Sequence, residues 1–233
     1  MDPTSVEAGR GAAWFGCGWQ VFAKNPGVWI VLTLSMIVIF LVLSRVPFGG
    51  LVLTLFAPAL AAGLLYGAAE LRAGRALAFG HLFQGFRDQA RLMPLLALGA
   101  VLLAAGVLSV LIALAFMRDA MTAMMDAPAT GMTHVGPGFL VGLLLMLTVH
   151  LIAALLVYFA VPLVMLQGVA AGDAMQRSLR ACLRNVLPLF VFSLIYLVAA
   201  VVASIPLGLG WILLLPWSVG MYYCSYTDIF PAG

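Results

Sequence analysis

The feature that most constrains this chain is the length of its apolar segments. A membrane-spanning helix needs about 20 mostly apolar residues to cross about 30 Å of hydrocarbon. Segments of this kind cover residues 28–43, 51–67, 95–117, 139–164, 187–205 and 207–223. Hydrophobic residues make up 65% of the chain and charged residues only 8%, which is more apolar surface than a soluble fold could cover. The pattern predicts an all-α integral membrane protein with about six transmembrane helices in a single domain, residues 1–233.

The number of spans has one alternative. The first two segments are short, and only "SIPLGLG" (204–210) separates the last two. Four spans with re-entrant pieces would also fit this pattern.

Other classes of protein fit the sequence poorly. The net charge is only +3, and long apolar runs separate the basic residues, so nucleic-acid binding is not expected. The opening "MDPTSVEAGR" lacks the cationic start of a secretory signal peptide. The three cysteines, Cys17, Cys182 and Cys224, have no paired spacing. Their odd number argues against a disulfide framework or a zinc site.

Cationic residues gather on one side of the predicted topology. Of the 11 lysines and arginines, only Arg45 and Arg118 fall in loops on the opposite side. Cytoplasmic loops of membrane proteins carry an excess of lysine and arginine. We therefore expect both termini to face the cytoplasm.

Three stretches beside the spans have the pattern of amphipathic helices that lie in the membrane interface. They include residues 15–22, 79–91 and 173–186, and Asp173 is expected near the N-cap of the last. A capping-box spacing at Thr4 and Glu7 predicts where the first one begins. The arginines opposite the apolar faces are Arg87, Arg91, Arg177, Arg180 and Arg184. We expect these arginines to contact the headgroups of membrane lipids, anionic phospholipids above all; plain cytosolic loops are the alternative.

The sequence also suggests an internal repeat, in which one helix-hairpin unit occurs three times, over roughly residues 6–70, 76–172 and 173–228. Each unit holds an interfacial helix, a span that starts near a proline, a turn with Pro and Gly, and a second span with an internal proline. The internal prolines and the acids that follow them are Pro58 and Glu70, Pro162 and Asp173, and Pro216 and Asp228. Because each unit has two spans, the copies would be parallel repeats.

Few residues could carry chemistry. His150 is the only ionisable residue deep in a predicted span, and such residues are functional candidates. We interpret it as structural, because Thr148 or a backbone carbonyl of a neighbouring helix could satisfy it and no second histidine lies in a span. The acids Glu70, Asp173 and Asp228 would lie at the cytoplasmic face. If these three acids converge on a water-filled pocket, they would form a polar site. If each acid pairs with an arginine instead, its role would be structural, and we favour this second interpretation.

No catalytic motif, metal site or cofactor site is predicted. The chain has no H-E-x-x-H sequence and no Walker A loop. The middle unit carries a methionine-rich insertion, residues 118–136, expected outside the cytoplasm. Thioethers suit Cu(I), but methionines at helical spacing more often form an apolar face.

Several local motifs point to a bacterial inner membrane. They are "LRACLRN" followed by Pro188, "PLGLG", and an ending of the form Y-x-x-Y-x-D-I-F at residues 223–230. With these motifs the chain resembles a group of uncharacterised proteobacterial multi-spanning inner-membrane proteins. The resemblance implies an inner-membrane location and no particular activity.

Two functions are compatible with these patterns. The first is a non-enzymatic lipid-interacting scaffold or permease-like unit, alone, as a homo-oligomer or with a membrane protein partner. The alternative is an enzyme that acts on lipid at the cytoplasmic face through Glu70, Asp173 or Asp228.

Overall fold

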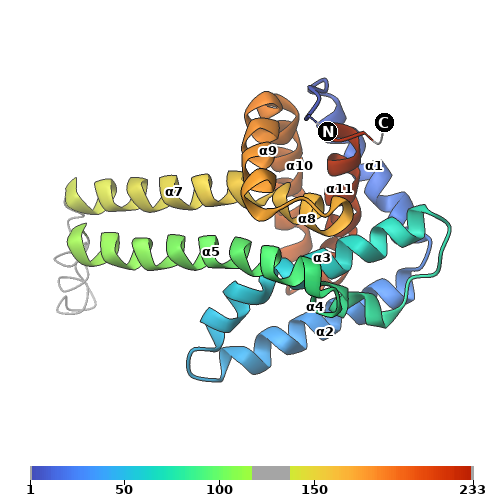
Figure 1. Cartoon of the computed structure of the whole chain (residues 1–233), viewed down its shortest axis with the longest axis horizontal. Helices are drawn as coiled ribbons and strands as arrows, with labels where there is room; N and C mark the ends of the chain where they lie inside the picture. The colour runs from blue at the N-terminus through green and yellow to red at the C-terminus, as the bar shows by residue number, and fades with distance from the viewer. Residues whose placement is uncertain (1, 117–136, 232–233) are drawn as a thin grey trace.

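The computed structural model describes residues 2–116 and 137–231, and this part of the chain is helical without strands (Figure 1). The elements are α1 (Arg10–Ala23), α2 (Pro26–Ser44), α3 (Gly49–Arg72), η1 (Phe79–Phe83), α4 (Gln84–Arg87), α5 (Gln89–Phe116), α7 (Pro137–Val157), α8 (Ala160–Gln167), α9 (Ala171–Arg184), α10 (Val186–Ser204) and α11 (Trp211–Ile229). Figure 1 shows α5 and α7 side by side as a two-helix arm that extends away from the other helices.

Within the described residues, five helices are long and apolar enough to cross a membrane. They are α2, α3, α5, α7 continued by α8, and α10. The sixth predicted span corresponds to α11, which begins at Trp211 because Leu207–Gly210 form a turn. The last part of α11 carries tyrosine, serine, threonine and aspartate, so its composition does not match that of the other five.

The long helices present apolar side chains outward. Val38 on α2, Leu111 on α5, Leu147 on α7 and Val198 on α10 each leave more than half of their surface uncovered. A soluble protein would not expose so much continuous apolar surface. The chain is a multi-pass membrane protein, and lipid is the solvent for these faces.

Helix boundaries follow local chemistry. Asn25 precedes α2, and its side-chain oxygen accepts a bond from the Val28 N–H, while Pro26 occupies the first helical position. Both are favoured at helix starts. Gly168 ends α8 in the left-handed conformation, with a φ of +69°, which glycine adopts without steric cost.

Pro162 breaks the fourth span into α7 and α8. A proline inside a helix has no N–H to donate and clashes with the carbonyl four residues earlier, here that of Tyr158. The Tyr222 hydroxyl of α11 donates to this carbonyl. The Ser178 hydroxyl of α9 accepts from the Phe159 N–H at 2.9 Å and donates to the Leu155 carbonyl at 2.7 Å. The backbone groups freed at the break are thus satisfied inside the protein, as a membrane interior requires.

The short helices pack on the long hairpins in sequence, and the first short helix, α1, packs on the last hairpin. Helix α1 packs on α11, η1 and α4 pack on α3, and α9 packs on α7 and α8. Each short element therefore contacts the second helix of the preceding hairpin, and α1 contacts the last hairpin. The chain closes on itself through α1 and α11, which bring the two termini together in Figure 1.

Small residues permit these close crossings. A Cβ on Gly85 of α4 would lie 2.3 Å from the Ala59 carbonyl oxygen, and one on Gly63 would lie 2.2 Å from that of Leu82. At the crossing of α1 with α11, a Cβ on Gly18 would lie 2.5 Å from the Met221 nitrogen. Small residues at such positions let helix backbones approach closely.

The three stretches predicted to be interfacial helices are helical, and each of the three differs from its prediction. Helix α9 starts at Ala171, so Asp173 lies in its first turn and Ala170 is the N-cap. The face of α9 that packs on the bundle is made of small residues: Ala174, Ser178, Ala181 and Cys182. The stretch 79–91 holds η1, α4 and the start of α5, and extended backbone at Asp88 separates α4 from α5.

The third difference concerns the N-terminus. The predicted capping box is wrong, because α1 begins at Arg10 and Thr4 bonds the far end of the chain. The Thr4 N–H donates to the Ile229 carbonyl at 2.9 Å. Tertiary pairing has taken the donor and acceptor that a local cap would have used.

Two glycines of α1 provide a matched test of the α1–α11 crossing. Gly16→Ala should raise the melting temperature slightly, since no atom lies within 4 Å of the new Cβ and alanine favours a helix interior by about 1 kcal/mol. Gly18→Ala should lower it by several degrees, because backbone atoms of Met221 occupy that space. Thermal unfolding of the purified variants in one detergent measures both. Equal shifts for the two variants would contradict the crossing.

Candidate functional site

A cavity of about 530 Å³ opens where the ends of several long helices meet. The C-terminal ends of α3, α8 and α11 and the first turn of α5 surround it. We call it the central cleft. Its polar lining consists of Tyr66, Glu70, Arg75, Arg91, Gln167, Tyr223, Tyr226 and Thr227. It is the candidate functional site, because polar groups from distant parts of the sequence share one cavity.

Two ion pairs line the central cleft. Arg75 donates from Nε and Nη2 to the two carboxylate oxygens of Glu70, at 2.5 and 2.6 Å. Arg91 forms an ion pair with Asp88, in which its Nε lies 2.7 Å from a carboxylate oxygen. The Glu70 side chain is largely covered, whereas that of Arg75 is exposed. Because a guanidinium has five N–H groups, each arginine keeps donors beyond those that face its carboxylate.

A third polar contact joins α8 to α11. The Gln167 side-chain amide donates to the Tyr226 hydroxyl at 2.8 Å. Tyr226 is buried and Gln167 partly buried. Because a phenol can donate as well as accept, this pair presents both donors and acceptors to the central cleft.

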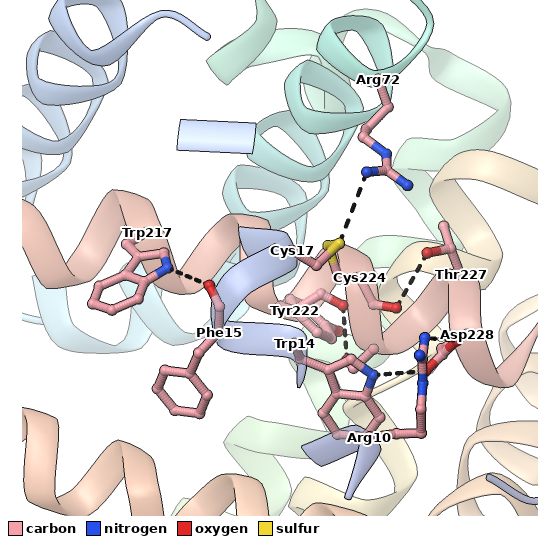
Figure 2. Close-up of a disulfide and its surroundings, with 11 residues drawn as sticks. Arg10, Trp14, Phe15, Cys17, Arg72, Trp217, Tyr222, Cys224, Thr227 and Asp228 are labelled. Atoms are coloured by element: carbon pink, nitrogen blue, oxygen red, sulfur yellow. Dashed lines mark hydrogen bonds and ion pairs between the residues drawn. A yellow bond between two sulfur atoms is a disulfide. The ribbon is translucent and has the colours of Figure 1, made fainter. Parts of the chain in front are cut away.

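A second cavity, about 340 Å³, lies between α1 and α11, where its lining includes Arg10, Trp14, Cys17, Arg72 and Asp228. We call it the terminal cleft. The Asp228 carboxylate accepts from Arg10 Nε at 2.7 Å, from Arg10 Nη2 at 2.6 Å and from Trp14 Nε1 at 2.9 Å (Figure 2). Burial alone would raise the pKa of Asp228, but these hydrogen bonds outweigh burial and hold the pKa below its usual range.

Cys17 and Cys224 form a disulfide beside the terminal cleft, with their Cα atoms 6.2 Å apart (Figure 2). The expectation that the cysteines are unpaired is therefore wrong for these two, while Cys182 is free and buried. The pair is separated by 207 residues, so only the contact between the first and last helices could reveal it. Arg72 Nη1 lies 3.8 Å from the Cys17 sulfur.

Asn185 is a structural residue that the sequence patterns missed. It is fully buried, and its side chain holds the N-terminal segment. The side-chain oxygen accepts from the Val6 N–H, and the amide donates to the Thr4 carbonyl, each at 2.9 Å. An asparagine before a span suggests an N-cap, but here the side chain binds another segment, which no local signal indicates.

The predicted acids do not share a cavity. Glu70 lines the central cleft and Asp228 the terminal cleft, and an arginine holds each of them bidentately. Asp173 lies exposed in the first turn of α9, and no ion pair to it is seen among residues 2–116 and 137–231.

His150 bonds within the α5–α7 arm. Its Nδ1 lies 2.9 Å from the Met146 carbonyl oxygen of its own helix and 3.2 Å from the Ser109 hydroxyl of α5. The Thr148 hydroxyl donates to the Leu144 carbonyl instead. The surroundings of His150 fit the structural interpretation.

The arginines predicted to contact lipid lie in four settings. Arg91 lines the central cleft, and the guanidinium of Arg87 lies over Gly80. Arg184 donates from Nη1 to the Pro3 carbonyl at 3.1 Å. Arg180 is exposed and Arg177 partly exposed on α9. In the described part of the chain, no group of histidine, cysteine, aspartate or glutamate could hold a metal ion. The methionine-rich insertion, residues 118–136, lies outside the described residues.

Comparison with known proteins gives one informative match. The chain is 25% identical to a probable inner membrane protein of Burkholderia thailandensis, over 97% of this chain and 91% of that protein. No protein-family model matches, and no solved structure matches. The similarity agrees with an inner-membrane protein that has several apolar helices.

Removing the disulfide should destabilise the purified, oxidised protein. A cross-link typically contributes about 2–4 kcal/mol, which for a chain of this size corresponds to roughly 4–16 °C in melting temperature. Cys17→Ser, Cys224→Ser and the double variant should show the same loss, because each removes one shared bond. Thermal unfolding with and without a reductant measures this. Additive losses, or a wild type insensitive to reductant, would contradict the pairing.

Proposed function

We propose that this protein is a non-enzymatic, lipid-interacting scaffold of the bacterial inner membrane. The observation that carries the proposal is the division of α9 into two faces. One face consists of small residues packed on α7 and α8. The other carries Arg180, which is exposed, Arg177, which is partly exposed, and Arg184, whose Nη1 donates to the Pro3 carbonyl. Leu183 and Val186 flank these arginines and are exposed. Cations beside exposed apolar side chains suit a helix at the boundary between headgroups and acyl chains.

Electrostatic attraction to anionic lipid would hold α9 at the membrane surface. Attraction to an anionic leaflet contributes about 1 kcal/mol for each cation near the surface, and the guanidinium fork can bind a phosphate through two hydrogen bonds. With Arg87 and Arg91 on the related stretch, the arginines would form a cationic collar around the cytoplasmic end of the bundle. Anionic phospholipids are the proposed partners.

The pairing of the acids supports a scaffold over an enzyme. Glu70 and Asp228 are each occupied by an arginine, so neither is a free general base in this arrangement. A permease would need polar groups that line a cavity at mid-membrane. In the described residues the polar cavities lie at the helix ends instead.

The proposal includes three parallel hairpin units and cytoplasmic termini. The repeated order of short helix, span and proline-containing second helix supports the units. Cytoplasmic termini would place Cys17 and Cys224 in a reducing compartment, where such pairs are kept as thiols. The contact between α1 and α11 does not depend on the bridge, because the Arg10–Asp228 pair and the Trp217–Phe15 hydrogen bond of 3.0 Å join the same helices.

The orientation has a direct test. A reporter that is active only outside the cytoplasm, fused after Gly233, should remain inactive, because the cation-rich loops retain that side of the chain in the cytoplasm. The same reporter fused after Arg45, between α2 and α3, should be active. The opposite pattern would reverse the topology.

The collar predicts a loss of lipid on neutralisation of α9. In native mass spectrometry, Arg177→Gln/Arg180→Gln/Arg184→Gln should lose most of the anionic phospholipid that the wild type retains, while zwitterionic lipid is unchanged. Arg45→Gln, at the opposite ends of the helices, is the control for loss of a cation elsewhere and should retain the lipid. Unchanged retention by a folded triple variant would overturn the collar.

A further inference from the structure

We infer that the central cleft binds the headgroup of one glycerophospholipid, with its phosphodiester between Arg75 and Arg91. The inference rests on the proposed lipid interaction but assigns a discrete site. The site shares Arg91 with the proposed collar, but the α9 arginines of the collar, Arg177, Arg180 and Arg184, do not line the cleft.

The two arginines have donors to offer a phosphate. Arg75 donates from Nε and Nη2 to Glu70, and Arg91 faces Asp88 with its Nε in an ion pair. A guanidinium has five N–H groups, so both side chains keep further donors. Their carboxylate partners fix the planar groups in place, which lowers the entropy lost when a ligand binds.

The same carboxylates determine which ligand charge the cleft favours. Glu70 and Asp88 nearly balance Arg75 and Arg91, so the cleft does not concentrate positive charge. A phosphomonoester carries nearly two negative charges at neutral pH and would be repelled by these carboxylates. A phosphodiester carries one charge and fits the balance better. Phospholipid headgroups of this kind are phosphodiesters.

The far wall of the cleft suits a hydroxyl-bearing headgroup. Gln167 and Tyr226, already paired at 2.8 Å, and the nearby Tyr223 supply polar groups that can donate and accept. Hydroxyl groups both donate and accept, so they match this wall. Met165, Leu166 and Phe230 supply an apolar part of the lining, suited to the glycerol ester region. A phosphoglycerol headgroup combines these features, and the cavity of about 530 Å³ is within the range of roughly 300–1,000 Å³ usual for small-ligand sites.

The position of the cleft agrees with a lipid source. The cavity lies at the ends of the membrane-spanning helices α3 and α8 and at the start of α5. Phosphates of a bilayer lie at this depth, just beyond the hydrocarbon. A soluble phosphate ester has the same headgroup chemistry without the acyl chains, so an experiment must separate the two sources.

The test uses variants that remove a cation without leaving a carboxylate unpaired. These are Glu70→Gln/Arg75→Gln and Asp88→Asn/Arg91→Gln, both in the full-length protein. Delipidated protein is titrated with phosphatidylglycerol in detergent and followed by native mass spectrometry. The comparison probes are phosphatidylethanolamine and glycerol 3-phosphate methyl ester, a phosphodiester without acyl chains.

We expect one phosphatidylglycerol to bind wild type tightly and each paired variant to lose at least tenfold in affinity. Gln167→Leu should lose affinity for phosphatidylglycerol more than for phosphatidylethanolamine. Arg45→Gln should bind as the wild type does. The triple variant of α9 should keep this one lipid while losing others, so failure of the collar and failure of the cleft are distinguishable.

Two results would overturn the inference. One is unchanged phosphatidylglycerol affinity in both paired variants, given a thermal unfolding profile like that of the wild type. The other is binding of the chain-free phosphodiester as tightly as the lipid, which would assign the cleft to a soluble phosphate ester. If the paired variants do not fold, Gln167→Leu alone decides: equal affinity for the two lipids in wild type and variant also overturns the inference.

Discussion

The contact between α1 and α11 determines how the other elements are arranged. Each short helix holds the hairpin before it, and the α1–α11 contact joins the first hairpin to the last. Gly18 and Gly220 let the two backbones meet, and the ion pair between Arg10 and Asp228 joins the helix ends. Helix α11 also packs directly on α2 and α3, which brings the ends of α3 and α11 together at the central cleft.

The membrane environment explains where hydrogen bonds are concentrated. In hydrocarbon an unsatisfied backbone group costs several kcal/mol, so the break at Pro162 needs substitutes for the lost helical bonds. Ser178 and Tyr222 provide them from two other helices. One proline therefore helps to fix the packing of α9 and α11 against α7, beyond what apolar contact alone would specify.

The sequence was most informative where local composition decides the outcome. Apolar length predicted α2, α3, α5, α7 and α10, and amphipathic spacing predicted α9 to within two residues at each end. It was least informative where distant segments meet. The Cys17–Cys224 bridge, the Asn185 clamp and the central cleft each join residues far apart in the chain. For Thr4, a strong local signal lost to a tertiary partner, the Ile229 carbonyl.

The closure between the two ends also bears on biosynthesis. Helix α1 is synthesised before its main partner, α11. Until α11 is made, the side chains that α1 packs on it are uncovered, among them Trp14, which donates to Asp228. The membrane surface is the natural temporary partner for such an amphipathic helix. The hairpins can insert one after another, but the closing contact forms only once α11 has been made, so truncation before α11 would leave inserted helices without it.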